Sequence, residues 1–322
     1  MADRSLQGCF LDTGTLGDAV DWTPLTQTLD HWQWHHHTAT PQVAGRICNA
    51  DVVITNKVII NAEAMAAAPH LRLICIAATG TNNVDLQAAA EHGIIVANVR
   101  DYAQPAVAQH VLALMLAHTT QWQHYAAAVD RGDWSHSPFF CLLDYPIEEL
   151  AGATLGIIGY GTLGQAVAKR ARAFDMRILI AERAQAQRVR DGRTELARVL
   201  AESDYISLHC PLTESTHHLI DHNALAAMKS TAYLINTARG PIIDETALAA
   251  ALHAGEIAGA AVDVLSAEPP PPDHPLLAGN IPGLIITPHC AWASRGARQR
   301  MLDTLAANIR AFLRGQPCNQ VA

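Results

Sequence analysis

Three charged or titratable side chains follow strand-like segments in the second half of the chain. Arg239 comes after YLINTA, Glu268 after AVDVLSA and His289 after LIITP. In an open parallel sheet, ligands bind outside the carboxyl ends of the strands, so these side chains can meet in one cleft. An imidazole can exchange a proton with a substrate oxygen, a carboxylate can orient that imidazole, and an arginine can polarise a carbonyl or hold a carboxylate. The combination suits reduction of a keto acid by hydride transfer, with His289 as the acid and base.

A glycine-rich turn precedes these residues in the chain. The sequence GYGTLG at 159–164 directly follows the apolar run LGII and directly precedes a helical segment. In this context the glycines allow a tight turn, a close approach of the backbone to a pyrophosphate and close packing of helix on strand. The predicted dinucleotide-binding residues here are Gly159, Gly161, Thr162, Leu163 and Gly164.

An acidic residue stands at the end of the next strand-like run, MRILIAE. Glu182 is expected to accept hydrogen bonds from the hydroxyls of the adenosine ribose, and its charge would repel a 2′-phosphate. The sequence therefore favours NAD over NADP. Arg183 is the next residue and could accommodate that phosphate, so NADP stays an alternative cofactor.

These motifs lie on an alternation of strands and helices. Apolar runs that predict six strands begin near residues 154, 176, 205, 232, 257 and 283, and helices are expected over about 162–174, 194–203, 221–229 and 244–254. This pattern is typical of a doubly wound, dinucleotide-binding sheet.

The first hundred residues show a similar alternation on a smaller scale. Strand-length apolar runs occur at 9–11, 50–55, 71–78 and 93–99, with Ala-rich helical segments between them, one of which ends at Gly93. Residues 104–130 predict one long helix, and an aromatic and proline-rich arm follows at 131–150. The segment 295–316 predicts a terminal amphipathic helix.

Composition excludes several classes of protein. The chain has 322 residues, half of them hydrophobic, and a formal net charge of −8, so broad attraction to nucleic acid or to anionic membranes is not expected. The seven cysteines are scattered without paired spacing, which favours a reducing cytoplasm. We expect neither an export signal nor a membrane span, because no basic N-terminal region precedes an apolar stretch and no apolar run reaches 18 residues.

The cluster HWQWHHH at 31–37 is dense enough to suggest a metal site. No carboxylate or cysteine stands at a recognisable spacing from it, so a solvated surface leading from a helix into a loop is favoured. The sequence therefore predicts no bound metal.

The order of these motifs resembles that of the D-isomer-specific 2-hydroxyacid dehydrogenases, and within them the glycerate dehydrogenase (hydroxypyruvate reductase) branch. The resemblance covers nearly the whole chain and is carried by ITNKV at 54–58, ATGTNNVDL at 78–86, AVAQH at 106–110, WSHSPFFCLLDYP at 134–146, GIIGYGTLG at 156–164, DYISLHCPLT at 204–213, LINTARG at 234–240 and TPHCAWAS at 287–294. It implies an α/β protein with two doubly wound parallel-sheet domains. A Rossmann NAD-binding domain, residues 100–289, would be inserted into a flavodoxin-like substrate domain made of residues 1–99 and 290–322.

The resemblance also implies roles for single residues. It implies that Arg239, Glu268 and His289 are the catalytic triad and that Asp263 holds the carboxamide of the nicotinamide. Cofactor contacts are further implied for Cys210, Pro211, Thr237 and Ala238, and substrate contacts for the N–H groups of Thr79 and Gly80 and for Trp292.

The expected reaction is the NAD(H)-dependent interconversion of hydroxypyruvate and D-glycerate, with glyoxylate and glycolate as a second pair. Asn56 and Lys57 form a polar loop after a buried strand, which suits a substrate that carries a hydroxyl group. The alternatives are a dehydrogenase of another small D-2-hydroxy acid and a dinucleotide-sensing, corepressor-like binding protein. By the resemblance the chain should form a homodimer through the long helix after Gln104 and the aromatic arm.

Overall fold

A computed structural model describes residues 5–322 of the chain. The chain divides into two units. The split unit comprises the chain up to Ala103 together with Ala293–Ala322, and the central unit comprises Gln104–Trp292. The borders fall a few residues beyond the predicted domain borders. Residues 290–292 belong to the central unit because Asp263 of that unit accepts hydrogen bonds from the N–H groups of Cys290 and Ala291, both at 2.9 Å.

The split unit is built on a five-stranded parallel sheet with the order β2-β1-β3-β4-β5. Its strands are β1 (Gln7–Phe10), β2 (His31–Trp34), β3 (Val52–Thr55), β4 (Leu73–Ile76) and β5 (Ile95–Ala97). The four predicted strands are confirmed, and this strand order is the flavodoxin-like one.

The segment HWQWHHH at 31–37 was expected to lead from a helix into a loop. It begins instead with the strand β2, so that expectation is wrong. β2 lies at the sheet edge with mostly exposed side chains, which explains its lack of an apolar pattern. The ring of Trp32 covers Gly8 of β1 so closely that a Cβ added there would lie 2.5 Å from it.

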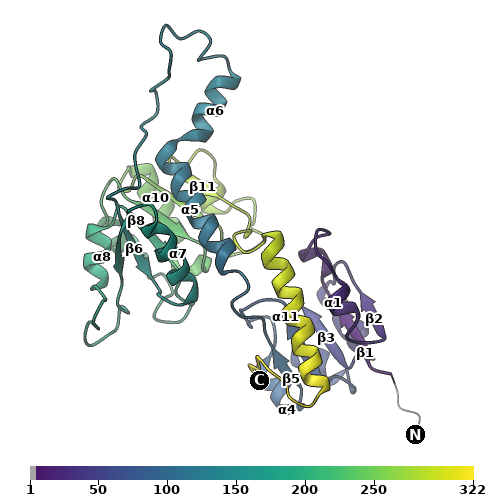
Figure 1. Cartoon of the computed structure of the whole chain (residues 1–322). Helices are drawn as coiled ribbons and strands as arrows, with labels where there is room; N and C mark the ends of the chain where they lie inside the picture. Colours follow the sequence, from purple (N-terminus) through teal and green to yellow (C-terminus); the bar gives the residue numbers. More distant parts are fainter. Residues whose placement is uncertain (1–4) are drawn as a thin grey trace. The chain divides into compact units, whose positions relative to one another are not determined.

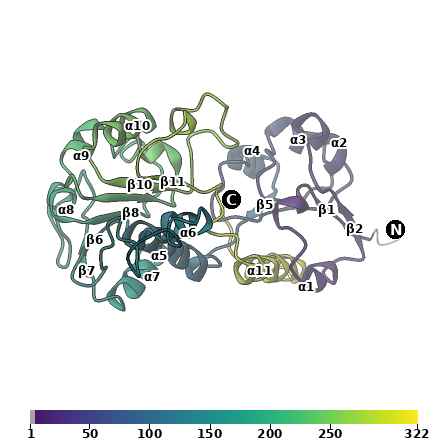
Figure 2. The same ribbon diagram turned by 90° about the horizontal axis from the view of Figure 1, so that it is seen from above.

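Helices cover both faces of this sheet (Figure 2). They are α1 (Thr23–Thr26), α2 (Val43–Ile47), α3 (Ala62–Ala66), α4 (Leu86–Glu91) and α11 (Arg295–Leu313). Gly93 has a φ of +67° after α4, and the N–H groups of Gly93 and Ile94 bond to carbonyls of the last turn. The predicted stop at Gly93 is therefore confirmed.

The central unit, labelled in part in Figure 1, contains the predicted six parallel strands. Their order in the sheet is β11-β10-β9-β8-β6-β7. They are β6 (Thr154–Ile158), β7 (Arg177–Ile180), β8 (Tyr205–Leu208), β9 (Tyr233–Asn236), β10 (Gly259–Val262) and β11 (Leu284–Ile286). A single parallel bridge joins Ala181 to Thr194 at the β7 edge. The chain passes from β6 outward to β7 and then crosses to β8, so the point where the strand order reverses lies between β6 and β8.

The helices of this unit lie on both sides of the sheet, except α6, which projects beyond it. They are α5 (Gln104–Thr120), α6 (Trp122–Asp130), α7 (Thr162–Arg172), α8 (Leu196–Glu202), α9 (His222–Ala226) and α10 (Glu245–Ala254). Figure 2 shows α9 and α10 on one face of the sheet and α5 with α7 on the other.

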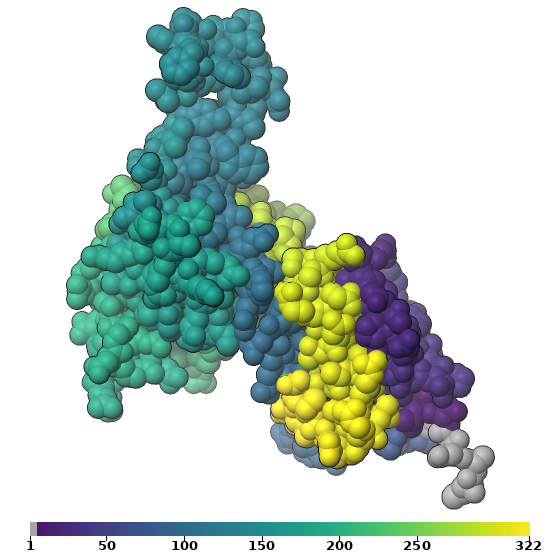
Figure 3. Space-filling model, in the orientation of Figure 1, coloured from purple at the N-terminus to yellow at the C-terminus, as the bar shows by residue number. Residues whose placement is uncertain are grey.

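The prediction of one helix over 104–130 is wrong. Gln121 adopts a φ of +52° and separates α5 from α6, and its side chain donates to the carbonyl of His118 at 2.7 Å. Neither Gly nor Pro marks this break in the sequence. Beyond it, α6 and the arm at 131–149 project from the rest of the central unit (Figures 1 and 3).

Within the described residues, no helix combines the length and apolar character that crossing a bilayer requires.

Candidate active site

The three glycines of the 159–164 turn have different surroundings. Gly159 has a φ of +96°, and a Cβ there would lie 2.4 Å from the backbone nitrogen of Cys210, so β6 and β8 end in close contact. A Cβ on Gly164 would lie 2.2 Å from the carbonyl oxygen of Gly159, which requires glycine where α7 packs on the turn. A Cβ on Gly161 would meet no atom within 4 Å, so the chain leaves space beside this residue.

The first turn of α7 offers hydrogen-bond donors beside that space. The N–H of Gln165 donates to Gly161 at 2.9 Å, whereas the N–H groups of Thr162, Leu163 and Gly164 find no acceptor within residues 5–322. Three unpaired N–H groups at the positive end of a helix fit an anionic pyrophosphate.

The turn after β9 also contains a polar group without a hydrogen-bond partner, the hydroxyl of Thr237. Asn236 holds this turn, since its side chain accepts from the N–H of Ala238 at 3.0 Å and donates to the carbonyl of Arg239 at 2.9 Å. The hydroxyl oxygen of Thr237 is buried and lacks a hydrogen-bond partner among the described residues. Such a group is costly unless a ligand satisfies it, which fits the predicted cofactor contact at Thr237 and Ala238.

Cys210 and Pro211 follow β8 on the neighbouring strand. Cys210 is half-buried and Pro211 is exposed, and burial raises the pKa of the Cys210 thiol above its usual value. The thiol is therefore neutral at physiological pH, and a cofactor contact at this position is apolar in character.

Glu182 has partners that the sequence did not predict. Its side chain is 4% exposed, and its two oxygens accept from the N–H of Arg183 and from three nitrogens of Arg190. The hydrogen bonds from Arg190 hold the pKa of the Glu182 carboxyl far below its usual range. This geometry does not favour the predicted role of Glu182 as a free acceptor for the ribose hydroxyls.

His289 and Glu268 form the pair that the sequence predicts. The Nδ1 atom of His289 lies 2.6 Å from Oε2 of Glu268, and Oε1 of the same carboxylate accepts from the N–H of Leu265 at 2.9 Å. Because a carboxylate only accepts, the proton between them belongs to Nδ1, and Nε2 is left for a substrate. Both side chains are partly exposed, at 26% and 35%.

The backbone at His289 is held in an unusual conformation. Its φ is +50°, which non-glycine residues rarely adopt, and its N–H donates to the carbonyl of Asp263 at 2.8 Å. Strain of this kind persists where the surroundings fix it and is concentrated at active sites.

Asp263 fixes the segment that carries His289. It is 1% exposed, and its carboxylate accepts from the hydroxyl of Thr287 at 2.5 Å as well as from the N–H groups of Cys290 and Ala291. The sequence assigned Asp263 to the nicotinamide carboxamide and missed this anchoring role. The carboxamide contact stays a prediction, with part of the carboxylate already engaged by the protein.

His110 lies close to the same anchor and was also not predicted as a site residue. Its Nε2 atom is 3.1 Å from the hydroxyl of Thr287 and 3.6 Å from Asp263. His110, Asp263 and Cys290 present ligand atoms within 4.8 Å of one another. The donor set does not fit a metal, because Asp263 is held by N–H and O–H donors and burial raises the pKa of the Cys290 thiol.

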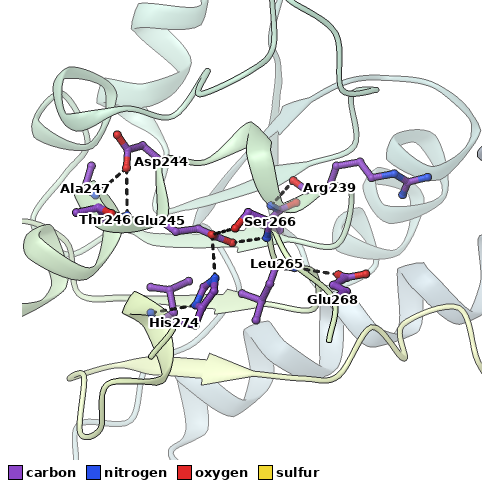
Figure 4. A network of polar contacts seen from close by, with 11 residues as sticks. Arg239, Asp244, Glu245, Thr246, Ala247, Leu265, Ser266, Glu268 and His274 are labelled. Atoms are coloured by element: carbon purple, nitrogen blue, oxygen red, sulfur yellow. Dashed lines mark hydrogen bonds and ion pairs between the residues drawn. The ribbon is translucent and has the colours of Figure 1, made fainter. Parts of the chain in front are cut away.

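Arg239 stands beside the loop that carries Glu268. Its neighbour Gly240 approaches the backbone of Leu265 so closely that a Cβ would lie 2.0 Å from the carbonyl carbon of that residue. Nη1 of Arg239 donates to Ala238 at 2.6 Å. Figure 4 shows the side chains of Arg239 and Glu268 extending in the same direction, away from Glu245.

A hydrogen-bond network that the sequence did not predict connects the loop that carries Glu268 to the start of α10 (Figure 4). Glu245, at the start of α10, accepts from the N–H of Ser266 at 2.8 Å and from its hydroxyl, and lies 3.0 Å from Nε2 of His274. His274 accepts from the N–H of Leu276 through Nδ1, so Nε2 carries the proton that it donates to Glu245. The network ties the segment after Arg239 to the loop before Glu268.

The predicted substrate residues differ in what they can offer. The N–H groups of Thr79 and Gly80 have no acceptor within residues 5–322, so they are available to an anion. Asn56 is 3% exposed, and its amide donates to the hydroxyl of Thr15 at 3.0 Å, so it stabilises its own loop. The N–H groups of Asn56 and Lys57 are bound by Asp12. Trp292 is half-buried at the end of the central unit.

Known proteins resemble this chain in both sequence and fold. The family model described as the NAD-binding domain of D-isomer specific 2-hydroxyacid dehydrogenases matches residues 112–291. The chain belongs to this family. It is 45% identical over 314 residues to a glycerate dehydrogenase of Methylorubrum extorquens, a match that covers 97% of this chain and 98% of that protein.

Two further relatives cover nearly the whole dehydrogenase chain. A hydroxypyruvate reductase of Blautia hydrogenotrophica is 39% identical over 321 residues, covering 98% of each chain. A crystal structure of a protein from Thermus thermophilus superposes with a TM-score of 0.85 and 36% identity, covering 98% of this chain and all of that one. The protein is thus an oxidoreductase that uses NAD or NADP and has a Rossmann domain, as the sequence predicts.

Proposed function

We propose that this dehydrogenase reduces hydroxypyruvate to D-glycerate and oxidises D-glycerate in reverse, with glyoxylate as a slower keto acid. The observation that carries the proposal is the His289–Glu268 pair beside Arg239, on a chain whose relatives are named glycerate dehydrogenase and hydroxypyruvate reductase. The corepressor-like alternative is not favoured, because these relatives cover nearly the whole chain and bear the names of enzymes.

Each residue of the proposed site has a separate role in the reduction of the keto acid. NADH supplies the hydride when bound. The imidazolium of His289 gives the proton from Nε2 to the oxygen of the keto group while Glu268 holds Nδ1, and the guanidinium of Arg239 stabilises the negative charge that grows on that oxygen. The N–H groups of Thr79 and Gly80 would bind the substrate carboxylate. The products are D-glycerate, the oxidised cofactor NAD⁺ and a neutral His289, which regains its proton from solvent.

The cofactor would be held by the central unit. The unpaired N–H groups at the start of α7 would bind the pyrophosphate, and the unpaired hydroxyl of Thr237 would gain a partner. Trp292 would line the active site, and Asp263 would keep His289 in position while contacting the carboxamide.

The substrate test compares three keto acids. We expect kcat/KM with NADH to be highest for hydroxypyruvate, which alone carries the hydroxyl group, lower for glyoxylate, and lowest for pyruvate, which places an apolar methyl group where the hydroxymethyl group would lie. A site built to bind a substrate hydroxyl can discriminate by up to about 10⁴-fold. Since the amide of Asn56 already donates to Thr15, Asn56→Ser should leave this ranking unchanged. Pyruvate as the best substrate would reject the assignment.

We also propose a homodimer in the cytoplasm. The arm and α6 expose large apolar side chains, with Phe139 at 73%, Phe140 at 90% and Leu143 at 79% exposure, as an interface between copies would require. The seven cysteines are free thiols, which suits a reducing compartment. Sedimentation should give about twice the chain mass of 34.6 kDa, and a monomer at micromolar concentration would contradict the proposal.

A further inference from the structure

The loop after β7 concentrates positive charge in an acidic protein. Between residues 183 and 193, named here the Arg loop, there are four arginines and a single acidic residue, in a chain whose formal net charge is −8. The arginines are Arg183, Arg188, Arg190 and Arg193, and the first three are exposed. Such local charge points to an anionic ligand rather than to a general surface property.

The Glu182 carboxylate, which would ordinarily repel an anionic ligand at this position, has all its acceptor positions occupied. An ionised carboxylate offers about four acceptor positions, and four are used here. Oε1 accepts from the N–H of Arg183 at 2.9 Å and from Nη2 of Arg190 at 2.5 Å, while Oε2 accepts from the N–H of Arg190 at 3.1 Å and from its Nε at 2.7 Å. The charge that would repel a 2′-phosphate is therefore neutralised by Arg190.

The Arg loop lies next to the dinucleotide site. It begins at the carboxyl end of β7, which pairs with β6, and β6 leads into the glycine turn. The guanidinium of Arg193 stands 5.1 Å over the ring of Tyr160, a residue of that turn. In a Rossmann domain this edge of the sheet receives the adenosine ribose.

We propose that the Arg loop is a receptor for the 2′-phosphate of NADPH, so that the dehydrogenase binds NADPH more tightly than NADH. The guanidinium groups of Arg183 and Arg188 are not bonded to Glu182 and supply planar forks that match a phosphate, while the side chain of Arg190 neutralises Glu182. The inference concerns the cofactor of the dehydrogenase family and does not depend on hydroxypyruvate as the substrate.

Binding measurements on the intact protein test the proposal without turnover. Titrations of NADPH and NADH, followed by nicotinamide fluorescence, and of 2′,5′-ADP and 5′-AMP by calorimetry, isolate the 2′-phosphate. We expect the phosphorylated member of each pair to bind about 10-fold more tightly at low salt, with an advantage that shrinks as ionic strength rises.

Matched variants separate the Arg loop from general charge. Arg183→Gln combined with Arg188→Gln should abolish the advantage, and Arg190→Met should reverse it by exposing the charge of Glu182. Arg172→Gln, at the far end of α7, is the control and should retain it. Equal binding of both members of each pair by the parent, or the same loss in Arg172→Gln, would overturn the proposal. Turnover of hydroxypyruvate is measured separately. If NADPH binds more tightly than NADH but hydroxypyruvate is not reduced, only the proposed substrate is rejected.

Discussion

At the scale of single residues, the chemistry depends on a short segment around His289. The positive φ at His289 is maintained by its N–H bond to Asp263, and the Asp263 carboxylate binds the next two N–H groups. The imidazole is oriented by Glu268, which is itself held by the N–H of Leu265. His289, the proposed proton donor, is therefore fixed through both its backbone and its ring.

Arg239→Lys tests the cationic part of the site. A lysine keeps the charge but lacks the planar fork, so we expect kcat/KM for hydroxypyruvate to fall by about 10²-fold or more, with NADH affinity unchanged. Arg198→Lys, on the exposed face of α8, is the matched control. Full activity in Arg239→Lys would show that another cation, such as Lys57, binds the anion.

The sequence predicts the triad but not the groups that hold it. Strand ends mark where Arg239, Glu268 and His289 must stand, because the apolar runs are periodic and the positions after them share one sheet edge. Hydrogen-bond partners across loops follow no such period. For this reason the pairing of Glu182 with Arg190 and the network around Glu245 could not be foreseen.

At the scale of elements, the turn from β6 into α7 is the proposed position of the cofactor. The close approaches at Gly159 and Gly164 are made within the protein, whereas the space at Gly161 is left open toward a ligand. Elements with strong apolar runs were predicted correctly. The edge strand β2 and the break at Gln121 were not, because an exposed strand lacks the apolar pattern and a left-handed glutamine carries no sequence signal.

Two alanine substitutions separate folding from binding at this turn. Gly164→Ala should destabilise the central unit by about 1–3 kcal/mol, because its Cβ would overlap the carbonyl of Gly159. Gly161→Ala should leave the melting temperature unchanged while weakening NADH binding by about 10-fold or more, because its methyl group would occupy the space left for the pyrophosphate. Equal melting temperatures for parent and Gly164→Ala, or undiminished NADH binding by Gly161→Ala, would contradict this account.

At the scale of the whole molecule, acid should destabilise the central unit through His118, which is buried, and His209, which is half-buried. Burial lowers the pKa of His118 and of His209 from 6.5 to about 4. Between those values the unfolded chain binds more protons than the folded one, so stability falls as pH drops from about 6.5 toward 4. The loss is on the order of 3 kcal/mol for each group at most.

Melting temperatures at pH 5 and pH 7.5 measure this effect. His118→Phe keeps an aromatic ring against Tyr233 and removes one titrating group, so the difference between the two pH values should shrink by roughly half. His253→Gln, an exposed change on α10, should leave the difference as in the parent. An identical pH dependence in His118→Phe and the parent would show that His118 does not contribute.

The central claim is that His289 delivers the proton in a stereospecific reduction of hydroxypyruvate. The most direct measurement combines NADH oxidation with chiral analysis of the product, for the parent and for His289→Gln. We predict that the parent forms D-glycerate in step with NADH consumed, and that His289→Gln binds NADH normally but turns over at least about 10²-fold more slowly. L-glycerate as the product, or undiminished turnover in His289→Gln, would contradict the account.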